Sequence, residues 1–90
     1  MELIHVEDQS KWLALNDEVQ IGELVYTRNE RTLTITNTEV EPYYRGNKIA
    51  EELVLAAIKL ARDNGLKVVP ACSFAETVFE RYPDERDVLA

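Results

Sequence analysis

The feature that most constrains the fold is an amphipathic helix set between two strands. In residues 47–64 apolar side chains recur every three or four positions, on a stripe that runs from Ile49 to Leu60. Gly65 then ends the helix, and residues 66–71 (LKVVPA) are typical of a buried strand. Since a strand, a helix and a second strand in this order make a parallel crossover, the sequence predicts an α/β unit.

The strand before the helix is the clearest in the chain. Residues 31–40 (RTLTITNTEV) alternate threonine with apolar side chains, and a short polar connection joins them to residues 19–27. The two segments therefore predict a β-hairpin. The apolar phase of the first one slips across Gly22 and Glu23, which indicates a β-bulge there.

After the helix the chain predicts an opening in the sheet and a second, shorter helix. Pro70 cannot donate a ladder hydrogen bond, so pairing is expected to weaken near the end of the last strand. Ser73 and Glu76 have the spacing of a capping box and predict a helix that runs to about Tyr82. The tail at residues 84–90 is expected to be irregular.

The whole chain, residues 1–90, is expected to form a single domain, because no repeat or linker divides it. Residues 3–6 and 11–15 are typical of short extended segments. The expected fold class is α/β, with a mixed, mainly antiparallel sheet of four or five strands and two packed helices.

Composition narrows the function classes. The net charge of −7 argues against a nucleic-acid partner. No apolar run approaches the length of a membrane span and no leader segment is present, so neither export nor a membrane partner is expected. Cys72 is the one cysteine, which excludes an internal disulfide and a four-thiolate zinc site. We expect a cytoplasmic protein without a metal, and its oligomeric state stays open.

The charge is unevenly distributed along the chain. Residues 43–67 hold five basic and three acidic residues, so they carry +2 while the rest of the chain carries −9. An anionic ligand is therefore best received in this middle segment. A solvated helix face would produce the same charge count.

The best candidate for such a ligand site is the connection at residues 43–50. The start of a helix presents N–H groups without intrahelical partners and a positive dipole end, which suits a phosphate. Arg45 and Lys48 add full positive charges, and Gly46 lets a ligand approach the backbone closely. Many strand-to-helix connections have a similar sequence and bind nothing.

Residues 36–83 resemble the small GCN5-related N-acetyltransferase-like family. Larger members of that superfamily have the loop pattern Arg or Gln, two residues, Gly, one residue, then Gly or Ala. Here Arg45, Lys48 and Ala50 stand in those three places. The resemblance implies that backbone amides wrap the diphosphate of coenzyme A while the pantetheine runs between splayed strands. The cofactor-binding residues that it implies are Arg45, Gly46, Asn47, Lys48, Ile49 and Ala50.

The sequence departs from the family pattern at two positions. Lys48 replaces the middle glycine, which removes backbone freedom and adds a cation. Asn37 stands where many relatives carry histidine, and an amide does not act as a general base near neutral pH.

Candidate catalytic groups follow from what acetyl transfer needs. The oxyanion that develops on the thioester requires a fixed donor, for which the backbone N–H of Val40 is the candidate. Glu39 and Glu41 are either bases that act through water or solvated surface groups. Cys72 is either a group that accepts the acetyl or protonates the leaving thiolate, or a small filler at the end of a buried strand.

These observations leave three functions open. The first is an N-acetyltransferase that moves the acetyl group of acetyl coenzyme A to a small amine or to a protein or peptide amine. The second is a non-catalytic acyl coenzyme A binding or sensing module, which Asn37 and the absence of a hydroxyl on Phe74 favour. The third is an interaction domain that has lost the ligand. The short chain predicts an open, shallow acceptor surface, which favours either a protein or peptide acceptor or a second subunit that completes the site.

Overall fold

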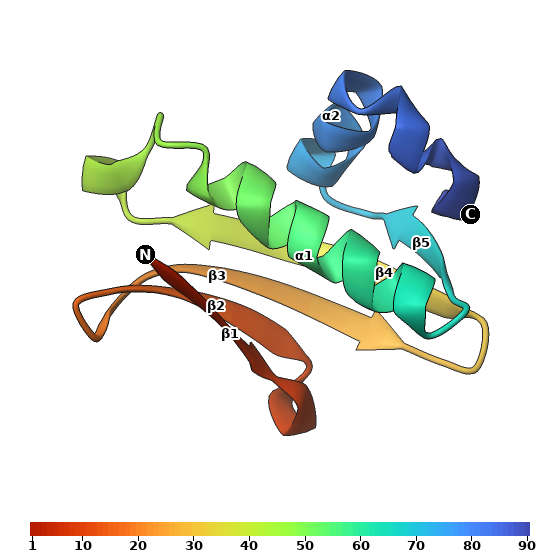
Figure 1. Ribbon diagram of the computed structural model, residues 1–90, viewed down its shortest axis with the longest axis horizontal. Coiled ribbons are helices and arrows are strands. Elements are labelled where there is room, and N and C mark those ends of the chain that lie inside the picture. Colours follow the sequence, from red (N-terminus) through yellow and green to blue (C-terminus); the bar gives the residue numbers. More distant parts are fainter.

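The sheet contains five strands arranged in sequence order, as the computed structural model of residues 1–90 shows (Figure 1). The first four strands are antiparallel, and β5 runs parallel to β4. The mainly antiparallel sheet and its parallel crossover are thereby confirmed. The strands are β1 (Glu2–Val6), β2 (Lys11–Asn16), β3 (Val19–Arg28), β4 (Thr32–Val40) and β5 (Lys67–Pro70).

Two α-helices and three short 3-10 helices complete the chain. Helix α1 begins two residues later than predicted, because Lys48 adopts a left-handed conformation (φ 61°) that a helix cannot include. None of the helices is long and apolar enough to cross a membrane. The α-helices are α1 (Ile49–Asp63) and α2 (Ser73–Arg81), and the 3-10 helices are η1 (Glu7–Gln9), η2 (Pro42–Tyr44) and η3 (Pro83–Val88).

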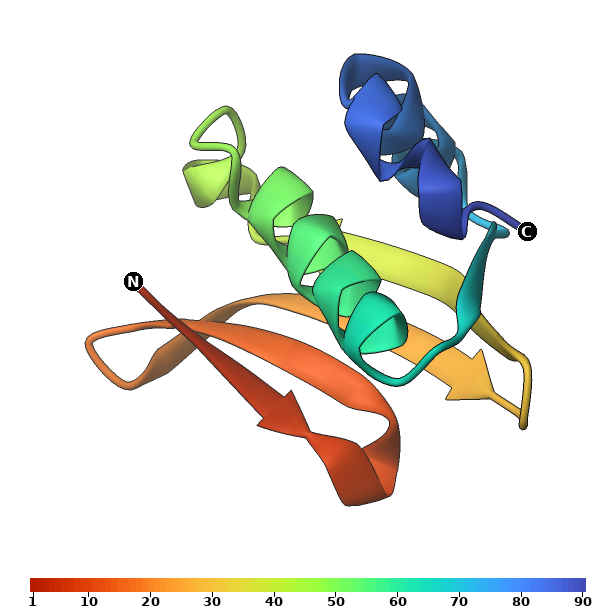
Figure 2. The same cartoon turned by 45° about the vertical axis from the view of Figure 1, so that its right-hand side comes forward.

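The core lies between α1 and one face of the sheet. Helix α1 crosses that face over β3 and β4, and α2 packs beside it near β5 (Figure 2). Leu53 and Ala57 of the helix are fully buried, as are Leu24 and Ile35 of the sheet. The helix approaches β3 so closely that a Cβ on Gly22 would lie 3.3 Å from a methyl group of Leu53. The apolar stripe predicted from the sequence is the stripe that packs.

Each of the two central strands carries one irregularity. On β3 the extra residue opposite β2 is Ile21, next to the bulge that the sequence predicts across Gly22 and Glu23. On β4, Thr36 has no partner opposite β3, since Tyr26 pairs with Ile35 and Val25 with Asn37. Side chains alternate across a strand, so this extra residue places Thr38 on the same face as Ile35.

The β4 and β5 strands separate half-way along β4. Residues Thr32 to Ile35 pair with Lys67 to Pro70, and β4 then continues to Val40 without a neighbour on that side. The opening predicted from Pro70 is confirmed. It leaves one edge of the second half of β4 free.

The start of α2 differs from the prediction. The N-cap is Cys72, in an extended conformation, and no side chain caps the helix. The prediction of a capping box at Ser73 and Glu76 is therefore wrong. The helix begins one residue earlier than a Ser73 cap requires, because the chain has already turned at Cys72. Ser73 lies inside the helix, where its carbonyl accepts a hydrogen bond from Thr77 Oγ1 (3.1 Å).

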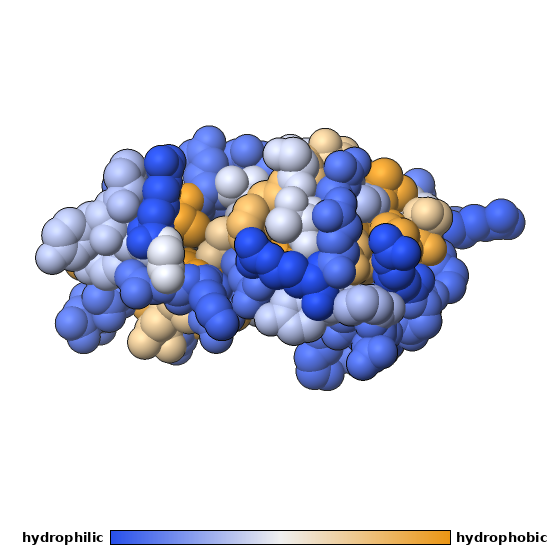
Figure 3. Space-filling model, turned by 90° about the horizontal axis from the view of Figure 1, so that it is seen from above, coloured by the Kyte–Doolittle hydropathy of each residue, from blue (hydrophilic) through white to orange (hydrophobic).

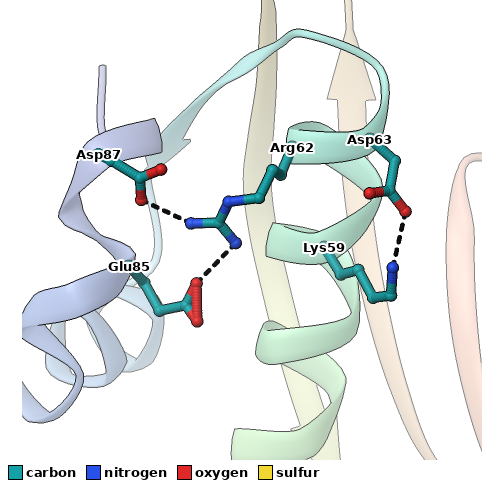
Figure 4. Close-up of polar contacts among 5 residues, drawn as sticks. All are labelled: Lys59, Arg62, Asp63, Glu85 and Asp87. Carbon is teal, nitrogen blue, oxygen red and sulfur yellow. Dashed lines mark hydrogen bonds and ion pairs between the residues drawn. The ribbon is translucent and has the colours of Figure 1, made fainter.

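The tail is ordered rather than irregular, which corrects the second prediction for this region. Arg62 of α1 pairs with Glu85 (2.7 Å) and Asp87 of η3, as Figure 4 shows. The chain then returns to β5, where Leu89 forms a bridge with Val68 and the N–H of Ala90 donates to the Val68 carbonyl (2.8 Å). These contacts depend on residues more than twenty positions apart, which local sequence patterns do not reveal.

Candidate functional site

A cavity of about 500 Å³ opens where β4, the following loop, the start of α1 and α2 meet. Figure 3 looks down on this side of the molecule and shows apolar atoms in the hollow between the loop and α2. The cavity is apolar on the side of Val40, Ile49 and Phe74 and cationic at its rim. Its lining residues are Thr38, Glu39, Val40, Tyr44, Arg45, Gly46, Lys48, Ile49, Ala50, Glu51, Phe74 and Arg81.

The loop at this cavity takes its shape from two left-handed residues. After the 3-10 turn of η2, Arg45 is extended and Gly46 has a φ of 92°, which glycine alone adopts without strain. A Cβ on Gly46 would meet no atom within 4 Å, so the space beside it is open. Lys48, with a φ of 61°, then turns the chain into α1. Open space and exposed backbone coincide at the start of the helix.

The N-terminus of α1 has no side-chain cap. The first hydrogen bond of the helix runs from the N–H of Glu52 to the carbonyl of Lys48 (3.0 Å). The N–H groups of Ile49, Ala50 and Glu51 precede it and have no intrahelical acceptor. Such uncapped amides at the positive end of a helix suit an anionic group.

Three cations and two carboxylates line the cavity, and two of the cations are unpaired. Arg45 and Lys48 form no ion pair with a protein carboxylate. Of the two carboxylates, Glu39 and Glu51, the second accepts hydrogen bonds from Arg81 Nη1 (2.9 Å) and from the hydroxyl of Tyr82 (2.9 Å). These two hydrogen bonds lower the pKa of Glu51 below its ordinary value, so the group is charged and neutralised by Arg81.

The free half of β4 directs backbone donors toward this cavity. The N–H of Glu41 donates to the Ile21 carbonyl on β3 (2.8 Å), and alternate residues of a paired strand face the same edge. The N–H groups of Thr38 and Val40 therefore face the opposite edge, where β5 has ended. The sequence marked Val40 as a candidate donor, and this alternation explains how its N–H is available.

A second cavity, of about 390 Å³, adjoins the first on the other side of Val40. The two cavities share Glu39, Val40 and Arg45. The second one is acidic, because Glu23 and Glu41 join Glu39 in its lining. Val40 thus lies at the junction of a cationic and an acidic cavity.

Five of the six loop residues predicted to bind a cofactor line the first cavity: Arg45, Gly46, Lys48, Ile49 and Ala50. The sixth, Asn47, instead donates from Nδ2 to the Tyr44 carbonyl (3.2 Å) and stabilises the loop. The structure therefore brings the predicted loop residues together around one space, while Asn47 supports it from outside.

The other candidate residues lie less centrally. Cys72 is part-buried and lines neither cavity, but its Sγ contacts Thr38 Oγ1 (3.7 Å), which does line the first. Asn37 is exposed, donates to Glu39 (3.3 Å) and lines neither cavity. The extra residue on β4 explains this position, because it leaves both Thr36 and Asn37 on the exposed face.

Sequence reasoning missed the contact of Glu51 with Arg81 and Tyr82. One signal was available: Glu51 precedes Val54 by three residues and Ile58 by seven, which places it on the apolar side of the helix. A carboxylate in that position requires a partner. The identity of the partners depends on where α2 packs, and the sequence does not show this.

The sequence matches the family model described as GCN5-related N-acetyl-transferase over residues 11–88. The chain belongs to the GCN5-related N-acetyltransferase family. The strand, loop and helix that form the first cavity all lie inside the matched segment. The resemblance proposed from residues 36–83 is thereby confirmed and extends to nearly the whole chain.

Solved structures show the same acetyltransferase fold. A GCN5-like protein from Staphylococcus aureus superposes with a TM-score of 0.70 at 26% identity, over 99% of this chain and 87% of that one. A ribosomal-protein-alanine N-acetyltransferase from Brucella melitensis has a TM-score of 0.67 at 17% identity, over 80% of this chain and 59% of that one. An aminoglycoside N-acetyltransferase in complex with CoA has a TM-score of 0.61 at 16% identity, over 79% of this chain and 63% of that one.

The chain therefore matches only part of the larger acetyltransferases. The chain spans less than two thirds of the aminoglycoside and ribosomal-protein enzymes, whereas it covers most of the protein from S. aureus. No protein with a curated description matches the sequence.

Proposed function

We propose that this protein is an N-acetyltransferase that takes the acetyl group from acetyl coenzyme A and transfers it to an amine. The observation that carries the proposal is the first cavity, which combines uncapped amides, free cations and an apolar wall at the place where β4 and β5 separate. A ligand with an anionic head and a long arm that combines apolar segments with amide groups fits this combination. Coenzyme A has that form.

The loop would hold the diphosphate of the ligand. The amides at the start of α1 face the cavity together with the side chains of Arg45 and Lys48. Lys48 supplies charge where the family pattern has glycine, and it keeps the left-handed conformation that glycine would adopt. The replacement therefore preserves the shape of the loop.

The free edge of β4 would hold the arm and the reacting carbonyl. The N–H groups of Thr38 and Val40 face the space that β5 leaves, so a pantetheine amide can pair there as a strand would. A thioester placed beside Val40 would receive the backbone N–H as the donor that stabilises the developing oxyanion. Acetyl coenzyme A supplies the activated acyl group as a thioester.

The acceptor amine would enter through the second cavity. Its carboxylates attract an amine in the cationic form, and Glu39, which lines both cavities, is placed to take a proton from the amine through water. The amine nitrogen then forms a bond to the carbonyl carbon while the carbon–sulfur bond breaks, and the departing thiolate takes up the second proton that the nitrogen loses. An open acidic cavity accepts a small polyamine or a lysine side chain of a peptide.

Binding is tested by calorimetric titration with acetyl coenzyme A. We expect a measurable affinity in the wild type and a large loss in Arg45→Glu, because the substitution reverses a charge beside the diphosphate. Arg28→Glu is the matched control, since it makes the same change of charge at an exposed residue that lines neither cavity. Equal affinity in the two variants would place the phosphates elsewhere.

A second candidate function is a non-catalytic acyl coenzyme A binding module. It is favoured by the position of Asn37, which lines neither cavity, and by Phe74, which lines the first cavity without a hydroxyl. The two functions are separated by incubating the protein with labelled acetyl coenzyme A and a library of lysine peptides. Labelled peptide supports the transferase. Bound ligand with neither labelled peptide nor labelled Cys72 supports the binding module.

A further inference from the structure

Glu51 is the one charged residue buried in the core region, with 5% of its surface exposed. An unpaired carboxylate in such a position is costly, so its partners matter. Both come from the end of α2: Arg81 donates from Nη1 to Oε1, and the Tyr82 hydroxyl donates to Oε2, each at 2.9 Å. A single carboxylate in the first turn of α1 thus fixes two side chains from a segment thirty residues away.

Arg81 keeps donors free after this contact. Its guanidinium carries five N–H donors in a planar fork, and the ion pair uses one terminal nitrogen. The side chain is 56% exposed and lines the first cavity, on the wall opposite the loop. Arg45 and Lys48 approach the same space from the loop side. Three cations from two separate segments therefore surround the N-terminus of α1.

The negative charge of Glu51 would by itself oppose the binding of an anion at the N-terminus of α1. A bare carboxylate in the first turn of α1 would repel a phosphate held by the amides just before it. Arg81 neutralises this carboxylate and remains able to donate to a second anion. Lysine is a poorer choice for such a double role, because it lacks the planar fork that can face two acceptors.

We propose that Arg81 is a third cationic ligand of the coenzyme A diphosphate and that Glu51 is the positioning residue that holds it there. This inference rests on the proposed function. The diphosphate then lies between the loop and α2, and Tyr82 fixes the other oxygen of Glu51 so that the carboxylate cannot rotate away. Affinity for the ligand depends on α2 as well as on the loop.

The test compares the affinity of wild type, Arg81→Met, Arg81→Lys and Glu51→Gln for coenzyme A and for dephospho-coenzyme A by calorimetry. Because Arg81→Met removes a charged hydrogen bond, we expect it to weaken the binding of both ligands by about tenfold. Arg81→Lys is expected to restore part of the lost affinity. Arg86→Met is the control, because Arg86 lines neither cavity. Its affinity is expected to equal that of the wild type.

Glu51→Gln is the most decisive variant, because the two possible roles of Glu51 predict opposite changes in ligand affinity. Removal of a negative charge beside the diphosphate would raise affinity if Glu51 acted through its charge alone. If Glu51 positions Arg81, affinity falls for both ligands. Thermal unfolding of each variant without ligand identifies any loss that follows stability instead of the contact.

Each result tests a different part of the proposal. Binding in the wild type with no loss in Arg81→Met overturns the role of Arg81 and leaves the proposed function standing. A loss for coenzyme A but not for dephospho-coenzyme A assigns Arg81 to the 3′-phosphate and overturns the diphosphate contact. A gain of affinity in Glu51→Gln overturns the positioning role. No binding in the wild type removes the proposed function itself.

Discussion

Lys48 combines backbone strain with a role in the proposed site, and the substitution Lys48→Gly separates the two. The residue precedes α1 with a φ of 61°, a conformation that side chains with a Cβ disfavour. Glycine adopts it freely but contributes no charge to the cavity. Stability and ligand affinity are therefore expected to change in opposite directions.

The expected gain in stability follows from two opposing effects. The left-handed conformation costs a residue other than glycine about 1–2 kcal/mol, and the greater freedom of glycine in the unfolded chain offsets about 0.4–1 kcal/mol of that. The free energy of unfolding of Lys48→Gly is then higher by about 0.5 kcal/mol or slightly more. In a domain of this size the unfolding midpoint rises by about 2–4 °C.

Lys48→Ala is the matched control for this experiment. Alanine removes the cation and keeps the Cβ, so its unfolding midpoint should stay close to that of the wild type. Both variants are expected to bind acetyl coenzyme A about two- to fivefold more weakly, the range for a solvent-exposed charge contact. Thermal unfolding and calorimetry measure the two quantities. A glycine variant no more stable than the alanine variant would refute the strain, and unchanged affinity in both would remove Lys48 from the ligand site.

Two further predictions concern packing and pH. Gly22→Val should lower the free energy of unfolding by about 1–3 kcal/mol, because a Cβ there would lie 3.3 Å from both the Glu39 carbonyl and Leu53; urea denaturation measures this, and wild-type stability would show that α1 can move away. Because the pKa of Glu51 is lowered in the folded protein, the charged carboxylate stabilises the fold at pH values above 4.5, the ordinary pKa of glutamate. This contribution is lost as the pH falls through the lowered pKa. The stability difference between wild type and Glu51→Gln should therefore shrink on acidification, whereas a constant difference would contradict the ion pair.

Local periodicity was sufficient to predict the central part of the fold. The apolar stripe of α1, the threonine alternation of β4 and Pro70 each report on a contact with the nearest elements. These patterns gave the crossover, the opening of the sheet and the loop that carries the candidate site. Five of the loop residues implied by the family resemblance do line the cavity.

The remaining features depend on contacts that no local pattern encodes. The extra residue at Thr36 decides that Thr38 lines the cavity while Asn37 does not, yet the alternation of threonines runs through this position without a break. The pairing of Glu51 with Arg81 requires α2 to pack against α1. In each case the outcome is set by tertiary packing that is stronger than the local preference.

The free half of β4 has a consequence for how the protein behaves in concentrated solution. An unpaired strand edge is a template on which another chain can add a strand, and such edges promote aggregation. At β5 the returning tail through Leu89 and Ala90 already covers part of the edge. From Thr36 to Val40 no strand pairs with this edge, and there the pantetheine arm would take the place of a neighbouring strand. Bound coenzyme A would then reduce self-association of the protein, in addition to its role in carrying the acetyl group. Light scattering with and without the ligand can measure this difference in self-association.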